Sequence, residues 1–275
     1  MNITKSSGEV VPFQAEKLKH SLKKAGASDE QLEKIYQELQ PLLVDGISTK
    51  KIYKMAFELL KKKKSSLAAR YQLKQAIMDL GPSGYSFEKY IAALWHQLGY
   101  QAKTNQMIKG NCINHEIDVL AENKNTTVLM ECKFHNQHGT MTDVKVPLYV
   151  HARFQDVWRS WQHHPSYRTK KTEGWLVTNT RFTSEATQYA RCVGLKLLGW
   201  DYPQQQGLKD LIDDLGLYPI TCLTTLTKTE KQRLLEKIVL CKEILQNPAV
   251  LEELTLSLSR YNHVIEEASI LCSHY

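Results

Sequence analysis

Two runs of sequence, His115-Glu116-Ile117-Asp118-Val119-Leu120 and Val128-Leu129-Met130-Glu131-Cys132-Lys133-Phe134, decide the fold. Both are rich in apolar residues and a short connection separates them, which predicts two adjacent strands in a hairpin. Because side chains alternate along a strand, Glu131 and Lys133 point to one face and the apolar residues around them to the other. A Glu and a Lys therefore project together, beside a neighbouring strand that carries Asp118.

The segments on either side of these strands have helix and strand patterns in alternation. A helix is predicted over 86–98, strands over 115–121 and 126–134, a helix near 147–163, a strand over 174–178, a helix near 183–193 and a strand over 195–200. Helix, two adjacent strands, helix, strand, helix and strand is the order of an α/β sandwich. We therefore expect an α/β fold for this part of the chain.

The clearest break in the chain is Gly81-Pro82-Ser83-Gly84, a run of turn-forming residues. A hairpin over Ile3 to Phe13, turning at Ser6-Ser7-Gly8, and helical patterns at 15–25, 28–43, 48–64 and 65–80 precede it, and after Pro203 the chain has only helical patterns. The sequence thus predicts three domains. They cover residues 1–82, mainly helical, residues 83–202, α/β, and residues 203–275, a small helical segment.

Charge and composition narrow the class of protein. The 275 residues carry a net charge of +7, and the positive excess lies before residue 203, while residues 203–275 carry more acidic than basic side chains. The first two domains could therefore attract a polyanion. No apolar run is long enough for a membrane span, the start lacks the apolar core of a secretory signal, and the six cysteines are scattered. These features favour a cytoplasmic protein with reduced thiols.

The carboxylates of the two strands have the chemistry of a metal site. Asp118 and Glu131 can hold a hard divalent cation, Mg²⁺ or Mn²⁺, and Lys133 beside them can orient a water and stabilise developing negative charge. Glu88, near the start of the preceding helix, could add a third carboxylate. Taken alone, this spacing also fits a hairpin whose polar face meets solvent.

From Gly84 to Trp200 the sequence resembles the Mrr-like branch of the PD-(D/E)XK nuclease superfamily. The similar stretches are Gly84–Glu88, His115–Val119, Met130–His135, Val177–Asn179, Ala186–Ala190 and Gly194–Leu198. The resemblance implies a restriction-endonuclease-like α/β/α core in which Asp118 and Glu131, with the backbone carbonyl of Cys132, bind the metal. It implies that Lys133 is the catalytic lysine and Glu88 a supporting acid. No role is carried over to Tyr149, and Arg153 and Lys145 are candidate phosphate contacts.

Residues 1–80 resemble an ATP-cone, a nucleotide-binding regulatory module. The similar residues include Ile3-Thr4-Lys5, Lys17-Leu18, Asp45–Thr49 and Leu67–Tyr71. The resemblance implies that Lys5, Lys17, Leu18 and Thr49 contact a nucleotide, with Tyr53 near the base. Because this segment has no Gly-rich Walker loop, we expect ATP or dATP to bind there as a regulatory ligand without being hydrolysed.

These observations predict a metal-dependent endonuclease that cuts double-stranded DNA and responds to ATP or dATP. One site cuts one strand, so we expect a homodimer or a nucleotide-dependent oligomer. Two alternatives stay open at this stage. One is a catalytically inactive module that senses nucleotides and binds DNA, which the intact set of Asp118, Glu131 and Lys133 disfavours. The other is an RNA-specific or structure-specific nuclease.

Overall fold

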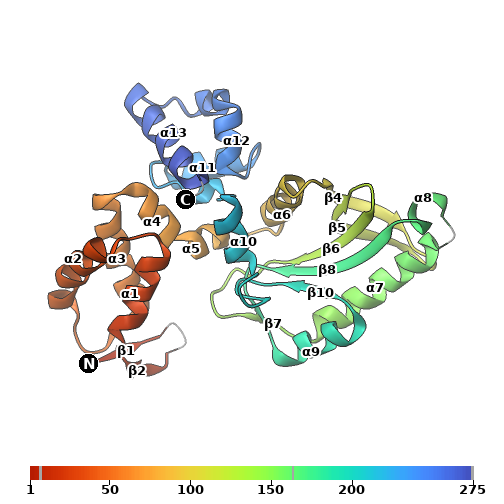
Figure 1. Ribbon diagram of the computed structural model, residues 1–275, viewed down its shortest axis with the longest axis horizontal. Helices are drawn as coiled ribbons and strands as arrows, with labels where there is room; N and C mark the ends of the chain where they lie inside the picture. The colour runs from red at the N-terminus through yellow and green to blue at the C-terminus, as the bar shows by residue number, and fades with distance from the viewer. Residues whose placement is uncertain (6–7, 163, 274–275) are drawn as a thin grey trace. The chain divides into compact units, whose positions relative to one another are not determined.

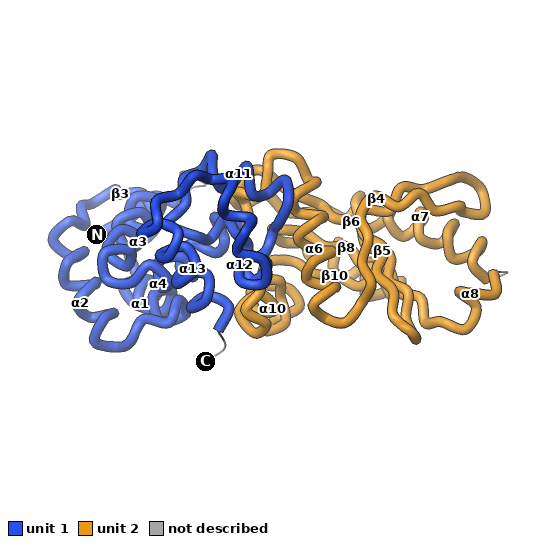
Figure 2. The backbone as a smooth tube through the Cα atoms, turned by 90° about the horizontal axis from the view of Figure 1, so that it is seen from above, with its two compact units in different colours: residues 1–76, 218–275 blue, residues 77–217 orange. Residues whose placement is uncertain are grey.

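The computed structural model describes residues 1–5, 8–162 and 164–273, so Ser6 and Ser7 of the expected N-terminal turn lie outside the described residues. The chain forms two compact units, coloured separately in Figure 2. Residues 1–76 and 218–275 make the first unit, and residues 77–217 make the second. Among the described helices, none is long and apolar enough to cross a membrane.

The first unit begins with a small three-stranded sheet in the order β2-β1-β3, with β1 antiparallel to β2 and parallel to β3. Its elements are β1 (Asn2–Thr4), β2 (Val10–Pro12), α1 (Ala15–Lys24), α2 (Asp29–Leu39), β3 (Ile47–Ser48), α3 (Thr49–Lys63) and α4 (Ser65–Tyr71). Helix α5 (Leu73–Met78) begins in this unit and ends in the second. Ser28 and Ser48 cap α2 and α3 by accepting backbone N–H bonds. The predicted helix over 28–43 gives way at Gln40–Leu42 to a 3₁₀ turn that contains Pro41.

The C-terminal segment folds against this same unit. It consists of α11 (Lys228–Leu235), α12 (Cys241–Gln246) and α13 (Leu258–Cys272), with 3₁₀ turns at Ile220–Cys222 and Pro248–Leu254. Gln72 Nε2 donates to the carbonyl of Cys222 at 2.7 Å, and Thr221 Oγ1 donates to the carbonyl of Ala76 at 2.7 Å. Helix α13 also packs against α4. The segment is helical, as the sequence predicts, and completes the unit that residues 1–76 begin.

A buried carboxylate holds the loop that leads into α11. Glu267, on α13, is 1% exposed and accepts hydrogen bonds from the backbone N–H and the hydroxyl of both Thr224 and Thr225, at 2.7 to 3.1 Å. Hydrogen bonds to an ionised carboxylate are among the stronger hydrogen bonds in proteins. The loop geometry therefore depends on this one side chain.

The second unit is built on a five-stranded mixed sheet in the order β10-β8-β6-β5-β4. The strands are β4 (Gln101–Lys109), β5 (Asn114–Glu122), β6 (Thr126–Lys133), β8 (Lys171–Thr178) and β10 (Lys196–Leu198). Strands β4, β5 and β6 pair antiparallel, and β6, β8 and β10 pair parallel. Strand β4, which forms one edge of the sheet, is absent from the elements that the sequence predicts.

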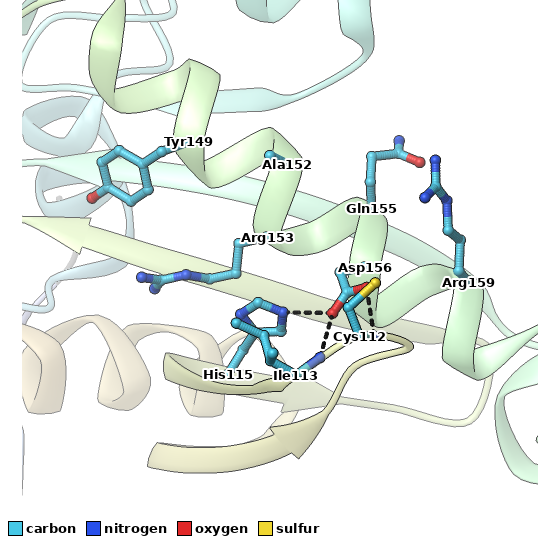
Figure 3. Close-up of a pocket in the computed structure, with 9 residues that line it drawn as sticks. All are labelled: Cys112, Ile113, His115, Tyr149, Ala152, Arg153, Gln155, Asp156 and Arg159. Carbon is cyan, nitrogen blue, oxygen red and sulfur yellow. Dashed lines mark hydrogen bonds and ion pairs between the residues drawn. The ribbon is translucent and has the colours of Figure 1, made fainter.

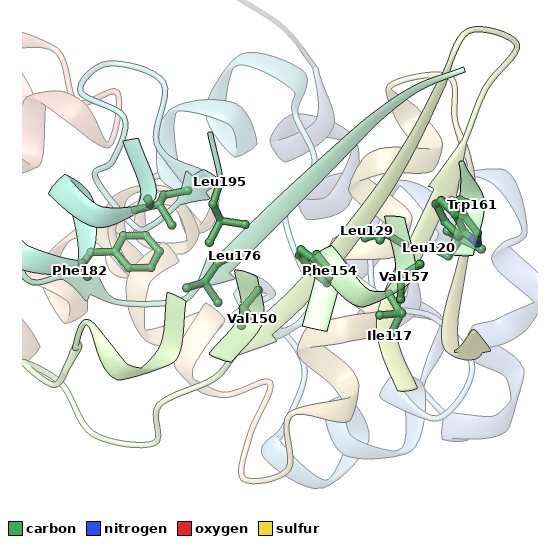
Figure 4. Packing of buried hydrophobic residues seen from close by; sticks show 13 residues of the cluster. Ile117, Leu120, Leu129, Val150, Phe154, Val157, Trp161, Leu176, Phe182 and Leu195 are labelled. Carbon is green, nitrogen blue, oxygen red and sulfur yellow. The ribbon is translucent and has the colours of Figure 1, made fainter. Parts of the chain in front are cut away.

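Helices cover both faces of this sheet (Figure 1). Helix α6 (Tyr85–Gln97) packs on β4 and β5, and on the opposite face α7 (Lys145–Trp161) packs on the sheet beside α9 (Ser184–Val193). Val150, Phe154 and Val157 of α7 are fully buried in a core against Leu129 and Leu176 of the strands (Figure 4). The predicted α/β/α layering is confirmed. Smaller elements complete the unit: β7 (Met141–Thr142), α8 (Pro165–Arg168), β9 (Arg181–Phe182) and α10 (Leu208–Leu215).

Both ends of the second unit are fastened within it. At the start, Met78 Sδ accepts a bond from Asn179 Nδ2 at 3.1 Å. At the end, the carbonyl of Leu217 accepts a bond from the hydroxyl of the fully buried Tyr90 at 2.8 Å. Helix α10 belongs to this unit, because the backbone N–H of Leu208 donates to the carbonyl of Gly199.

Glu267→Ala tests the role of the buried carboxylate. It leaves the Thr224 and Thr225 donors without their acceptor, so we expect the free energy of unfolding of the first unit to fall by about 3 kcal/mol. All five tryptophans lie in residues 77–217. The urea midpoint of Glu267→Ala should therefore shift more when unfolding is monitored by far-UV circular dichroism than when it is monitored by tryptophan fluorescence. The matched control is Glu266→Ala, at the exposed neighbour on α13, which should change stability by less than about 0.5 kcal/mol.

Candidate active site

The pairing of β5 and β6 places two carboxylates side by side. The paired register ends at Val119 and Met130, next to Asp118 and Glu131, and the charge of Asp118 acts on Glu131, so the two carboxyl groups lie near each other at this end of the hairpin. The backbone N–H of Cys132 donates to Asp118 Oδ2 at 2.7 Å. Burial raises the pKa of Asp118 and the nearby Glu116 acts in the same direction, while the Cys132 bond and Arg153 oppose them.

Glu131 is held by two side chains of α7. It is 9% exposed, its Oε1 accepts a bond from the hydroxyl of Tyr149 at 3.0 Å, and its Oε2 accepts one from Arg153 Nη1 at 2.5 Å. Arg153 Nη1 also donates to the carbonyl of Glu116 at 3.2 Å. Burial, with a further contribution from Asp118, raises the pKa of Glu131 to about 7 even though Arg153 and Tyr149 act against the shift.

The third carboxylate comes from the opposite helical layer. Glu88 lies in the first turn of α6, and burial, followed by the charges of Asp118 and Glu116, raises its pKa to about 7. The charge of Asp118 thus raises the pKa of both Glu88 and Glu131, and Glu88 also raises the pKa of Glu131, so the three carboxyl groups lie near one another. Such a cluster has a strong electrostatic preference for a cation.

Lys133 lies two residues beyond Glu131, on the same face of β6, and is half-buried. Its position is fixed through the backbone, because Thr178 Oγ1 donates to the Lys133 carbonyl at 2.7 Å. Asn179 holds the chain just beyond, accepting from the N–H of His135 at 2.8 Å and donating to its carbonyl at 2.9 Å. The structure thus brings Glu88, Asp118, Glu131 and Lys133 together around the end of β6.

Sequence reasoning did not assign the contacts of Tyr149 and Arg153 with Glu131. It treated Arg153 as a candidate phosphate contact, whereas the structure pairs its guanidinium with the carboxylate. The available signal was the spacing of four residues between Tyr149 and Arg153, which puts both on one helical face. That spacing does not indicate which strand residue they reach.

The donor set fits the metal that the sequence predicts. Among the residues that the structure describes, no group of three or more His, Cys, Asp or Glu side chains forms a ready-made cage. Mg²⁺ does not need one, because it usually keeps several waters and takes one or two carboxylates. Asp118 and Glu131, with the Cys132 carbonyl, fit that pattern, and the raised pKa values of the two carboxyl groups reflect burial first and neighbouring negative charge second.

The residues expected to bind a nucleotide lie in the first unit. Thr4 pairs with Ser48 in the parallel β1–β3 ladder, so the residues that follow them, Lys5 and Thr49, lie at the same end of the small sheet. Lys5 Nζ is 2.8 Å from Glu9, and Lys17 is exposed in the first turn of α1. Leu18 is only 8% exposed and packs in the core.

Tyr53 already has an aromatic partner. Its ring stacks on that of Tyr71, with centroids 4.6 Å apart and planes 15° apart, and its hydroxyl donates to the Tyr71 carbonyl at 2.7 Å. One face of the Tyr53 ring is therefore covered, and an approaching base would meet the pair as a unit.

Three parts of the chain match known protein families. Residues 1–77 match the ATP cone domain, residues 81–202 the Mrr-type restriction endonuclease domain, and residues 218–272 the AF1548-like C-terminal domain. A protein of Archaeoglobus fulgidus, described as uncharacterized, is 38% identical over 179 residues, which make up 65% of this chain and 97% of that protein. This chain belongs to the AF1548-like family. The two resemblances inferred from sequence are confirmed, and the C-terminal match is one that sequence reasoning did not name.

One solved structure supports the fold. The crystal structure of AF1548, a protein of unknown function, is 37% identical, with a TM-score of 0.55, and the match covers 69% of this chain and 98% of that one. Can2 from Sulfobacillus thermosulfidooxidans, solved in complex with cyclic tetra-adenylate, is 12% identical, with a TM-score of 0.35, and the match covers 72% of this chain and 52% of that one. The second likeness is too remote to bear on function.

The raised pKa values predict how stability depends on pH without metal. Glu88 and Glu131 bind protons in the folded protein up to about pH 7, whereas in the unfolded chain they release them near 4.5. Their contribution to stability is therefore present below pH 4.5 and is lost as the pH rises to about 7. With EDTA, we expect the midpoint of thermal unfolding, followed by tryptophan fluorescence, to fall over this range.

Glu131→Gln removes one of the two titrations, so the fall should be shallower in this variant. Mg²⁺ should raise the midpoint of the wild-type protein at pH 7.5 and not that of Glu131→Gln. The control is Glu185→Gln, at an exposed carboxylate of α9, which should keep the wild-type fall. Superimposable profiles for the wild type and Glu131→Gln would contradict the coupling of Glu131 to this site.

Proposed function

We propose that this AF1548-like protein is a Mg²⁺- or Mn²⁺-dependent endonuclease that hydrolyses phosphodiester bonds in double-stranded DNA and is regulated by ATP or dATP. The observation that carries the proposal is the grouping of Asp118 and Glu131 at one end of the β5–β6 hairpin, where Lys133 follows Glu131 on the same strand. Glu88 approaches the same point from α6. It is supported by the restriction endonuclease match over residues 81–202.

Each residue has a distinct part in this chemistry. Asp118, Glu131 and the carbonyl of Cys132 would hold the cation, which supplies Lewis-acid activation of a water and of the scissile phosphate. Lys133 orients the attacking water and stabilises the negative charge that develops on the phosphate oxygens. Glu88 orients the surroundings of the cation, and Thr178 keeps the Lys133 backbone in place. Because the pKa of Glu131 is about 7, its carboxylate is available for binding mainly above neutral pH.

Tyr149 and Arg153 orient Glu131 in this proposal. Each donates to a different carboxylate oxygen, so the side chain keeps one rotamer while lone pairs remain available on both oxygens. The charge of Arg153 also opposes the rise in the pKa of Glu131 that burial causes.

The regulatory part of the proposal rests on the ATP-cone. Lys5 and Lys17 would contact the phosphates, Thr49 and the backbone at Leu18 would line the site, and the Tyr53–Tyr71 pair would meet the base. The nucleotide then acts by favouring one arrangement of domains or subunits, either a homodimer or a nucleotide-dependent oligomer. Six free cysteines are compatible with a reducing, cytoplasmic location.

Lys133→Ala tests the catalytic assignment. The variant keeps both carboxylates and loses the charge that stabilises the transition state, so the rate of plasmid cleavage with Mg²⁺ or Mn²⁺ should fall by at least about a hundredfold. DNA binding and thermal stability should stay close to wild type. Asp118→Ala should also abolish cleavage. The control Lys124→Ala, in the exposed β5–β6 turn, should retain full activity. Cleavage of RNA but not DNA by the wild type would redirect the proposal to an RNA-specific nuclease.

The nucleotide site is tested by calorimetry on the full chain. ATP and dATP should bind without release of phosphate over hours. Lys5→Ala combined with Lys17→Ala should weaken binding by at least about a hundredfold, because two charged contacts to phosphate are lost. Basal cleavage should be unchanged. The control is the double variant Lys24→Ala and Lys62→Ala, at two exposed lysines elsewhere on the same unit. It should bind ATP and dATP as the wild type does. Absence of any binding heat in the wild type would remove the regulatory part of the proposal.

A further inference from the structure

A groove of about 710 Å³ runs along the exposed side of α7 in the second unit (Figure 3). Tyr149, Arg153 and Arg159 line it on the helix, and Cys112, Ile113 and His115, from the β4–β5 hairpin, line it on the sheet. Tyr149 and Arg153 are the two residues that hold Glu131. The groove therefore begins at the candidate active site and leads away from it along the helix.

The walls of the groove are fixed by one acid. Asp156, on α7, accepts bonds from the backbone N–H of Cys112 at 2.9 Å and of Ile113 at 3.3 Å, and its Oδ2 lies 2.8 Å from His115 Nε2 (Figure 3). The bond with His115 is the largest cause of a lowered pKa for Asp156, which is therefore ionised. Its negative charge is taken up by these donors, which fasten the hairpin to the helix.

The two arginines that line the groove differ in their partners. Arg153 is paired with Glu131. Arg159 is exposed and makes no hydrogen bond, ion pair or ring contact with any other residue that the structure describes. It lines the same groove as Arg153, six residues further along α7, which corresponds to about 9 Å of helix rise. Asp156 lies between them in the sequence and is turned to the hairpin, and Ala152, which precedes Arg153, is small, so neither side chain fills the groove.

We infer that this groove receives one strand of the DNA to one side of the scissile phosphate, and that Arg159 binds a neighbouring phosphate of that strand. The inference rests on the proposed nuclease function. A fixed groove that starts at the hydrolytic centre and carries an unpaired guanidinium at its far end has the features that a phosphodiester chain requires. The helix rise of about 9 Å between the two arginines exceeds the roughly 3.4 Å axial rise per nucleotide of a DNA strand, so Arg159 contacts a phosphate other than the one being cut.

The test measures DNA binding by the full chain as a function of salt. A fluorescent duplex is titrated in EDTA, which prevents cleavage, and the slope of log K against log salt concentration is determined. Arg159→Ala should reduce the magnitude of this slope by about 0.9, the value for one phosphate contact, and weaken binding about tenfold. Arg159→Lys should restore most of the slope. The matched control, Arg191→Ala on the exposed surface of α9, should leave slope and affinity unchanged.

A second variant tests the groove itself. Ala152→Glu places an acidic side chain in the groove at an exposed helix position, so it should weaken binding and slow cleavage at least tenfold. Gln188→Glu adds the same charge to the exposed face of α9 and should do neither. Thermal unfolding identical to wild type excludes a folding defect in each variant.

The outcomes separate the inference from the proposed function. If the wild type cuts DNA while Arg159→Ala keeps the wild-type slope, the strand lies elsewhere and the inference alone is overturned. If Arg159→Ala weakens binding only of an RNA duplex of the same sequence, the assignment of DNA to the groove is overturned. If the wild type neither binds nor cuts DNA with any metal, the proposed function fails and the inference with it.

Discussion

The hydrogen bond from the Cys132 backbone to Asp118 couples the chemistry of the site to the pairing of β5 and β6. A slip of one residue in β6 would turn Glu131 and Lys133 to the opposite face and bring apolar side chains into their place. The core forbids that slip, because Leu129 on the same face is fully buried against α7. The carboxylate cluster, the strand register and the core are therefore a single constraint.

Helix α7 connects this constraint to the remainder of the unit. One of its faces buries Val150 and Phe154 against the sheet, and an adjacent face carries Tyr149 and Arg153 to Glu131. Burying like charges together is unfavourable, and this cost appears as the raised pKa values of the carboxyl groups. The same helix that stabilises the core thus supplies the positive charge that offsets part of this cost.

The features that could be predicted from sequence are the local ones. Alternation along a strand is enough to place Glu131 with Lys133, and helical spacing is enough to predict α7. Strand β4 was not predicted because it lies at the sheet edge, where alternate positions such as Lys103 and Asn105 are polar and exposed, so no strong apolar run marks it. The partners of Arg153 depend on how α7 crosses the sheet, and the burial of Leu18 depends on tertiary packing. Neither is encoded in a short window of sequence.

The return of residues 218–275 to the first unit makes the nuclease unit an insertion into another domain, joined to it by two chain crossings. A domain connected through two linkers has less rotational freedom than a domain connected through one. The crossings end at Met78 and Leu217, which bond to Asn179 and Tyr90. Tyr90 lies two residues from Glu88, and Asn179 clamps the chain two residues beyond Lys133. Tension on one tether would thus act on the helix that carries Glu88, and tension on the other would act on the backbone just beyond Lys133.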